Sequence, residues 1–113
     1  MAKETIFSKI IRKEIPSDEV YSDELCLAFR DVQPQAPTHI LIIPRKEIAS
    51  LREIDEKDKM LLGHLLFIAT KVATQEGLKD WRTVINTGEN AGQTVFHLHV
   101  HVIGGRQLNW PPG

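Results

Sequence analysis

The sequence has little cysteine, no long apolar run and no excess of charge of either sign. Its 113 residues include one cysteine, Cys26, which excludes an internal disulfide and fits a reducing compartment. Fourteen basic and fifteen acidic residues give a formal net charge of −1, which argues against a nucleic-acid-binding module. No apolar stretch is long enough to span a membrane, and the N-terminus has no signal-peptide core. These absences predict a soluble cytoplasmic protein without a nucleic-acid or membrane partner.

The length and composition are those of one globular domain. With 42% apolar and 26% charged residues, the chain has ordinary values for a folded protein of this size. We expect residues 1–4 to form a frayed tail. Residues 104–113 are rich in proline and glycine, so we expect an irregular C-terminal segment there. A single domain over residues 1–113 is therefore predicted.

Hydrophobic periodicity predicts an α+β fold. Thr5 is expected to cap a short helix that ends before Pro16, and Asp55 to cap a long helix over residues 56–76. Alternating or β-branched runs predict strands at residues 20–21, 25–32, 38–43, 83–86 and 94–103. The expected stripe of apolar residues on the long helix is Met60, Leu61, Leu65, Ile68, Val72 and Ala73. Together these elements make an antiparallel sheet of about five strands with one short N-terminal and one long helix.

Three of the five histidines lie at alternate positions of the last predicted strand. His97, His99 and His101 are separated by Leu98 and Val100. Because alternate side chains of a strand point to opposite faces, the three imidazoles share one face, with neighbours roughly 6.5–7 Å apart. Folding does not require a row of imidazoles, so the pattern indicates chemistry on that face. His39, inside the buried run 38–43, is either a structural residue or a neighbour of this strand.

Two kinds of chemistry suit such a row of imidazoles. Neutral imidazole binds zinc, but the outer two residues lie more than about 13 Å apart by strand rise, too far for one ion. No second histidine or cysteine pair completes a site, so we predict no metal and no cofactor. Neutral imidazole is also a nucleophile toward phosphorus at cellular pH, and neighbouring imidazoles can hold charge and supply a proton.

A nucleophile that attacks phosphorus needs donors for the phosphoryl oxygens. The loop formed by Gly92, Gln93 and Thr94 can offer backbone N–H groups and a hydroxyl, and Asn86 can offer an amide. A plain hairpin turn would explain these loop residues equally well.

The histidine segment resembles one known family. Residues 97–103, HLHVHVI, match the His-φ-His-φ-His-φ-φ motif for which the histidine-triad (HIT) family is named. The segments that are similar to its Hint branch are 5–7, 9–11, 29–32, 34–39, 92–94, 104–107 and 110–113. The terminal Trp-Pro-Pro-Gly separates this branch from the Fhit-like dinucleoside polyphosphate hydrolases and from the uridylyltransferases. The resemblance covers nearly the whole chain.

The resemblance implies a purine nucleoside phosphoramidase, which cleaves a P–N bond to give AMP or GMP and an amine. His99 would be the nucleophile that becomes transiently nucleotidylated. His97 would hold its ring through the backbone and, with Thr94, assist the leaving amine. His101 would bind the phosphate, with His39 behind it as support. Many Hint proteins carry serine where this chain has Thr94, and the hydroxyl is retained.

The same resemblance implies how a purine nucleotide would be held. Asp31 would accept the two ribose hydroxyls, although from the residues alone it would equally suit a turn. The base would lie against Ile6, Phe7, Ile10, Phe29 and Val32, which by composition are simply core residues. Asn86, Gly92 and Gln93 would reach the phosphate side.

Hint proteins are homodimers in which two sheets join into ten strands and the long helices pack together. By resemblance, the C-terminal segment would bring Trp110 toward the site of the partner subunit, whereas a disordered tail is the alternative. Two other functions stay open beside the phosphoramidase. One is a dinucleoside polyphosphate hydrolase or AMP transferase with the same nucleophile, and the other is a non-catalytic nucleotide-binding module.

Overall fold

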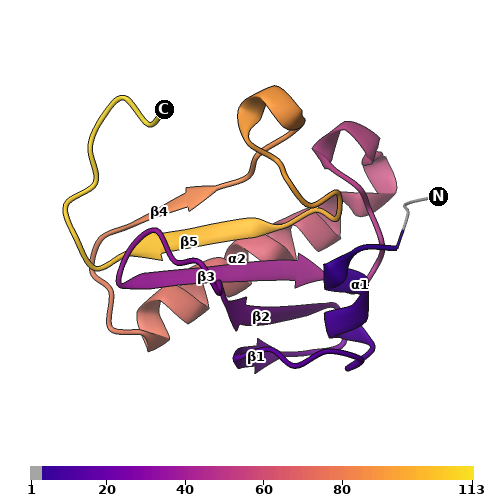
Figure 1. Cartoon of the computed structure of the whole chain (residues 1–113). Helices are drawn as coiled ribbons and strands as arrows, with labels where there is room; N and C mark the ends of the chain where they lie inside the picture. The colour runs from indigo at the N-terminus through magenta and orange to yellow at the C-terminus, as the bar shows by residue number, and fades with distance from the viewer. Residues whose placement is uncertain (1–3) are drawn as a thin grey trace.

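A five-stranded antiparallel sheet is the centre of the computed structural model, which describes residues 4–113 (Figure 1). Its strands are β1 (Glu19–Ser22), β2 (Cys26–Arg30), β3 (Thr38–Pro44), β4 (Trp81–Val84) and β5 (Val100–Gly104). They lie in the order β1-β2-β3-β5-β4, so β3 is central and β1 and β4 are the edges. The predicted fold class is confirmed.

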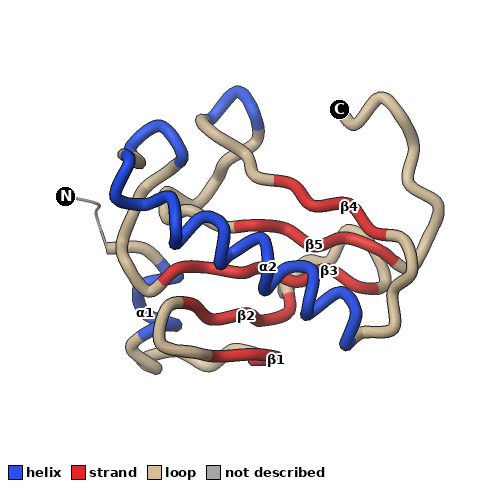
Figure 2. Tube along the Cα trace, turned by 180° about the vertical axis from the view of Figure 1, so that it is seen from behind, coloured by secondary structure: helices blue, strands red, loops and turns tan. Residues whose placement is uncertain are grey.

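Two helices lie on opposite faces of this sheet. α1 (Ile6–Ile11) is short, and α2 (Lys59–Gln75) is long. Figures 1 and 2 show α2 running across one face of the sheet, with α1 on the far side. Single turns of 3₁₀ helix lie at Leu51–Glu53, Glu56–Asp58 and Glu89–Ala91. The long helix predicted over residues 56–76 is therefore a 3₁₀ turn followed by α2.

Short polar side chains begin both helical segments, as predicted. Thr5 accepts two backbone N–H groups from the first turn of α1. Asp55 and Asp58 form a reciprocal capping box ahead of α2. At the other end of α2, Gly77 adopts a φ of +80°, which lets the following N–H groups bond back to the last helical turn.

The alternation of side chains along the strands divides the core in two. In β2, Cys26 and Ala28 face α2, whereas Leu27 and Phe29 face α1. The residues that α2 buries are Leu65, Ile68, Ala69, Val72 and Ala73. Met60 was expected among them but is 87% exposed, because it lies about 150° around the helix from the centre of this stripe.

The histidine segment is a strand only in its second half. Residues 94–103 were predicted as one strand, but β5 begins at Val100. The pairing of β5 with β3 stops at Val100, which lies opposite Ile42, although β3 continues to Pro44. Leu98 instead donates its N–H to the Ile48 carbonyl oxygen at 2.7 Å. A loop on the α2 side of the sheet therefore holds the first part of the segment.

The remaining strand boundaries differ from the predictions by one or two residues, as strand ends commonly do. The short helix was expected to continue to Pro16 but ends at Ile11, and Lys13 beyond it has a φ of +61°, which is not helical. Residues 1–3 of the predicted frayed tail lie outside the described residues, and Glu4 forms an ion pair with Arg12. No helix or strand follows Gly104 in the described C-terminal segment 105–113. Within residues 4–113, no helix combines the length and the apolar character that crossing a membrane requires.

Candidate active site

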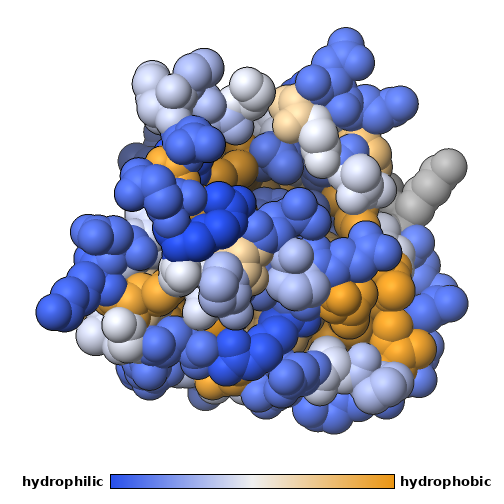
Figure 3. Space-filling model, turned by 60° about the vertical axis from the view of Figure 1, so that its left-hand side comes forward, coloured by the Kyte–Doolittle hydropathy of each residue, from blue (hydrophilic) through white to orange (hydrophobic). Residues whose placement is uncertain are grey.

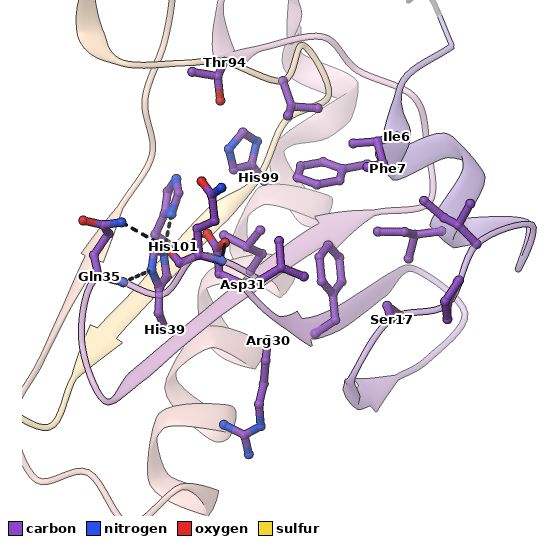
Figure 4. Close-up of a pocket in the computed structure, with 18 residues that line it drawn as sticks. Ile6, Phe7, Ser17, Arg30, Asp31, Gln35, His39, Thr94, His99 and His101 are labelled. Carbon is purple, nitrogen blue, oxygen red and sulfur yellow. Dashed lines mark hydrogen bonds and ion pairs between the residues drawn. The ribbon is translucent and has the colours of Figure 1, made fainter.

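A pocket of about 410 Å³ opens on the α1 side of the sheet (Figure 4). This volume is typical of a site for a small organic ligand. The lining residues are Ile6, Phe7, Ile10, Ile15, Pro16, Ser17, Phe29, Arg30, Asp31, Val32, Gln33, Gln35, His39, Leu41, Thr94, Val95, His99 and His101. One part of the pocket is apolar and the other is lined by histidines.

Aromatic side chains form the apolar part. The rings of Phe7 and Phe29 meet edge to face with centroids 5.5 Å apart, and both side chains are buried. Ile6 and Val32 stand exposed at the rim. Figure 3 shows apolar side chains gathered in patches between polar ones on one face of the molecule. A flat, apolar group fits against these walls.

The polar part of the pocket is a cluster of three imidazoles. The ring centroids of His99 and His101 lie 4.9 Å apart, and those of His39 and His101 lie 5.1 Å apart. The antiparallel pairing of β3 with β5 places His39 Nε2 at 2.9 Å from His101 Nδ1. Of the two sequence interpretations of His39, a place beside the histidine strand is confirmed.

The hydrogen bond of His99 decides which of its nitrogens carries the proton. Its Nδ1 lies 2.8 Å from the carbonyl oxygen of His97. Because a carbonyl oxygen only accepts, Nδ1 donates, and Nε2 of the neutral ring keeps a free lone pair. The side chain of His97 is itself buried and donates from Nε2 to the Pro44 carbonyl oxygen at 2.8 Å. His97 therefore holds the His99 ring through its backbone, as expected.

The partners of His39 decide the proton positions in the second pair of rings. The backbone N–H of Gln35 donates to His39 Nδ1 at 3.0 Å, so the proton of the neutral ring is on Nε2. His39 Nε2 then donates to His101 Nδ1, which leaves the proton of His101 on its own Nε2. That Nε2 is the only buried side-chain nitrogen or oxygen without a partner among residues 4–113. An unpartnered buried donor is costly, so it indicates a place for a ligand acceptor.

Burial keeps these imidazoles uncharged near neutral pH. It lowers the pKa of His99 and of His39 below the usual histidine value, although the Asp31 carboxylate opposes the shift. Burial, together with the neighbouring His99 and His39, lowers the pKa of His101 to about 4. The lone pair of His99 and the N–H of His101 are therefore both present at pH 7.

Asp31 lies at the rim, between the two parts of the pocket. Its Oδ1 accepts the N–H of Gln33 at 2.8 Å, and its Oδ2 lies 3.5 Å from His39 Nε2. Its side chain keeps 20% of its surface exposed. Asp31 is therefore a turn residue and also a pocket residue with a free acceptor.

The remaining predicted phosphate-side residues are not all brought to the pocket. Gln93 is 1% exposed, and its amide donates to the carbonyl oxygens of Ala49 and Val95. The backbone N–H groups of Gly92 and Gln93 bond to carbonyl oxygens of their own loop, which differs from the expectation that they face a ligand. The Asn86 amide lies 3.5 Å from the Gly92 carbonyl oxygen and does not line the pocket. Of this group, Thr94 alone is a lining residue, above His99 in Figure 4.

Sequence reasoning missed several lining residues. Leu41 lies two positions after His39 on the same face of β3, and alternation could have identified it. Val95 precedes His97 by two positions, and the same signal applies. Ser17 comes from a turn beside α1, for which the sequence offers no signal.

Trp110 does not line the pocket of its own chain. Its side chain is 80% exposed, and the Arg82 guanidinium lies 5.9 Å from the centroid of its ring. Arg82 also donates to the Asn109 carbonyl oxygen at 2.9 Å. The C-terminal segment is thus attached beside β4 at the edge of the sheet.

Among residues 4–113, two groups of side chains have donor atoms close enough for a metal ion. Asp31, His39 and His101 form one group, and Asp23, Cys26 and His64 form the other. In the first, the hydrogen bond between the two rings would have to break before either facing nitrogen could bind an ion. In the second, the His64 ring and the Asp23 carboxylate are likewise joined at 2.7 Å. Hydrogen bonds therefore account for both groups.

Comparison with known proteins gives a consistent result. A HIT-like protein of Synechococcus elongatus is 61% identical over 114 residues, which cover all of both chains. A 14 kDa zinc-binding protein of Zea mays is 58% identical over 112 residues, which cover 96% of this chain and 88% of that one. A HIT family hydrolase from Legionella pneumophila has a TM-score of 0.95 and 47% identity, and covers 97% of this chain and 100% of that one.

The match to the family model is just as extensive. It includes residues 12–108, and therefore most of the pocket and all of the histidine segment. The chain has the fold of HIT family hydrolases and belongs to the HIT domain family.

Proposed function

We propose that this chain is a purine nucleoside phosphoramidase of the Hint type, which hydrolyses a P–N bond to AMP or GMP and an amine. One observation carries the proposal. A free lone pair on His99 Nε2 and an unpartnered N–H on His101 Nε2 meet in one pocket, beside an apolar wall. A nucleophile next to a donor for a phosphoryl oxygen suits attack on phosphorus.

In the first step, His99 Nε2 attacks phosphorus and the P–N bond breaks. The amine leaves with the bonding electron pair and takes a proton from the Thr94 hydroxyl, which lines the pocket and recovers its proton from water. The His99 ring becomes positively charged, and the carbonyl oxygen of His97 stabilises that charge through Nδ1–H. His101 Nε2–H donates to a phosphoryl oxygen throughout.

In the second step, water attacks phosphorus on the nucleotidylated ring. The bond between phosphorus and His99 Nε2 breaks, and the electron pair returns to the ring. The water loses one proton to solvent, which balances the proton supplied to the amine. The net reaction adds one water across the P–N bond.

The rest of the pocket suits a nucleotide. Asp31 has a free carboxylate acceptor for ribose hydroxyls, and Phe7 and Phe29, which pack edge to face on each other, supply an aromatic wall for a purine.

The test is the intact mass of the protein after mixing with adenosine 5′-phosphoramidate and rapid acid-free quenching. We expect a mass increase of one adenylyl group that maps to His99 and is absent in His99→Ala. AMP release without an adduct, suppressed by a chelator, would overturn the proposal in favour of a metal-dependent reaction. The measurement with a chelator is included because the maize relative is named a zinc-binding protein.

Parallel assays separate the two alternatives. Faster cleavage of a dinucleoside tetraphosphate than of the phosphoramidate would indicate a polyphosphate hydrolase. Nucleotide binding without turnover of either compound would indicate a binding module.

We also propose that the protein is a homodimer. α2 presents Met60, Leu66 and Phe67 to solvent at 87%, 47% and 66% exposure, and β4 is an unpaired sheet edge. A second copy would cover both features, extend the sheet to ten strands and bring Trp110 near the other site. Light scattering should give twice the chain mass, and Phe67→Lys should halve it. A monomeric wild-type protein would contradict this proposal.

A further inference from the structure

Arg106 lies outside the pocket but holds one of its loops. Its Nε and Nη2 lie 3.1 and 2.9 Å from the Gln35 carbonyl oxygen. The turn before it is packed on the same loop: a Cβ added at Gly105 would lie 2.9 Å from Pro37 Cβ. Gly105 has a φ of +97°, so this close approach and this backbone conformation both need glycine. The turn after β5 is thus fitted to loop 33–37.

Gln35 uses both of its main-chain groups in this arrangement. Its carbonyl oxygen accepts from Arg106, and its N–H donates to His39 Nδ1 at 3.0 Å. One residue therefore connects an exposed guanidinium to a buried imidazole.

The bond from Gln35 is what selects the proton positions of the two rings. His39 Nε2 and His101 Nδ1 are 2.9 Å apart, and either nitrogen could donate to the other. Both arrangements have one hydrogen bond between the rings, so that bond alone does not determine which tautomer each ring adopts. The Gln35 N–H makes His39 Nδ1 an acceptor, which puts the proton of His101 on Nε2. In the opposite arrangement, His101 Nε2 would be bare and would repel a phosphoryl oxygen.

We propose that Arg106 is a positioning residue that, through Gln35, keeps the proton of His101 on Nε2 and so maintains the donor that faces the substrate phosphoryl group. The proposal deepens the proposed phosphoramidase function and rests on it. Arg106 is exposed and does not line the pocket, so it acts on the substrate only through the loop.

The direct test is the ¹⁵N spectrum of the imidazoles, which distinguishes a protonated from a bare ring nitrogen and needs no substrate. In wild-type protein we expect a bare Nδ1 and a protonated Nε2 in both His39 and His101. In Arg106→Met, both rings should shift toward the opposite tautomer, whereas His99 should not, because the His97 carbonyl oxygen holds it. Arg106→Lys, which retains one donor, should restore part of the wild-type pattern.

A matched control is available at the other end of the sheet. Arg45 also holds a loop carbonyl oxygen, that of Asp23 at 2.8 Å, and lies away from the pocket. Arg45→Met should lower stability to a similar degree but leave all imidazole spectra unchanged. Equal spectral changes in Arg45→Met and Arg106→Met would overturn the proposal, because they would indicate a general loss of structure.

A second pair of variants tests the backbone N–H of Gln35 and leaves Arg106 unchanged. Gln35→Pro lacks the backbone donor, and Gln35→Ala retains it. We expect the altered tautomers in Gln35→Pro alone. Wild-type tautomers in both Gln35→Pro and Arg106→Met would overturn the proposal.

Kinetics connect the tautomers to the reaction. For a nucleoside phosphoramidate, Arg106→Met should lower kcat/KM about tenfold, the effect of one hydrogen bond to a charged group, with part restored in Arg106→Lys. The acid limb of its pH profile should move to higher pH, because His39 Nδ1 becomes free to take a proton.

If wild-type protein has no phosphoramidase activity while the spectra change as described, the proposed function fails and the role of Arg106 in setting the tautomers stands. Unchanged kinetics despite altered spectra would overturn the role in the reaction.

Discussion

The face of the sheet that α2 covers is lined by apolar side chains, whereas the face toward α1 holds three buried imidazoles and the half-buried His101 among its apolar residues. On the α2 face, burial removes apolar surface from water and so stabilises the fold. It also raises the pKa of the Cys26 thiol to about 12, which leaves that group unreactive. On the α1 face, each buried imidazole is held in one orientation and kept uncharged. The same degree of burial thus supplies stability on one side and reactivity on the other.

The largest expected effect comes from the nucleophile on the α1 face. His99→Gln should lower kcat for a nucleoside phosphoramidate by about 10³-fold or more, because the glutamine amide has no nucleophilic nitrogen to replace the imidazole. The free energy of unfolding should change by only about 1 kcal/mol, since no apolar core is lost. Steady-state kinetics and urea unfolding measure the two. A large loss of stability with only a modest loss of activity would show that His99 serves the fold more than the reaction, which would contradict the assigned difference between the two faces.

Acid should destabilise the protein through the α1 face. Burial lowers the pKa of His39, His97, His99 and His101, so the unfolded chain binds protons first as the pH falls below about 6.5. The free energy of unfolding should therefore decrease from pH 7 to pH 5, by about 2 kcal/mol for each imidazole that stays neutral in the folded state. The decrease should continue toward pH 4, where folded His101 titrates.

Urea unfolding at a series of pH values measures this dependence. A stability that is constant between pH 7 and pH 5 would show that the folded imidazoles have ordinary pKa values. His99→Gln should have a shallower dependence than the wild-type chain, since one of the four groups is gone.

A truncation on each face compares the two cores directly. Ile68→Ala, on the α2 face, should lower the free energy of unfolding by about 2–4 kcal/mol and leave kcat/KM of the folded protein unchanged. Leu41→Ala, on the α1 face, should cost similar stability and also raise KM, because Leu41 lines the pocket. Equal changes in KM in the two variants would show that a truncation on the α2 face disturbs the pocket as much as one on the α1 face.

The smallest effect is expected at the rim. Asp31→Asn should raise KM about tenfold with little change in kcat, because it weakens an acceptor for the ribose but leaves the histidines in place. A deoxyribose substrate should lose this difference between the variant and the wild-type protein. If it does not, Asp31 acts through the turn and His39 instead.

Local sequence signals predicted the elements that local physics controls. The caps at Thr5 and Asp55 and the glycine that ends α2 follow from the hydrogen-bonding needs of helix ends. The alternation of residues 97–103 separated the imidazoles from the core residues Leu98, Val100 and Val102, and of the three imidazoles His99 and His101 line the pocket whereas His97 does not. These features depend on residues a few positions apart, so a single sequence contains them.

The sequence could not predict what distant segments contribute. The strand predicted over residues 94–103 is shortened because its pairing with β3 stops at Ile42 and the Leu98 N–H bonds to the Ile48 carbonyl oxygen. The N–H groups of Gly92 and Gln93 are used inside their own loop. The proton positions in the site depend on Gln35 and on a contact between residues 62 positions apart. Such features follow from tertiary pairing, which periodicity does not encode.

The alternation in the histidine segment has a consequence for how this chain can evolve. Leu98, Val100 and Val102 are at most 1% exposed in the core under α2, and the imidazoles occupy the positions between them. Inserting or deleting one residue here would exchange the two sets, sending imidazoles into the core and apolar side chains into the pocket. The segment is therefore free to change residue by residue but not in length, and lineages of this protein should differ in length in their turns and termini.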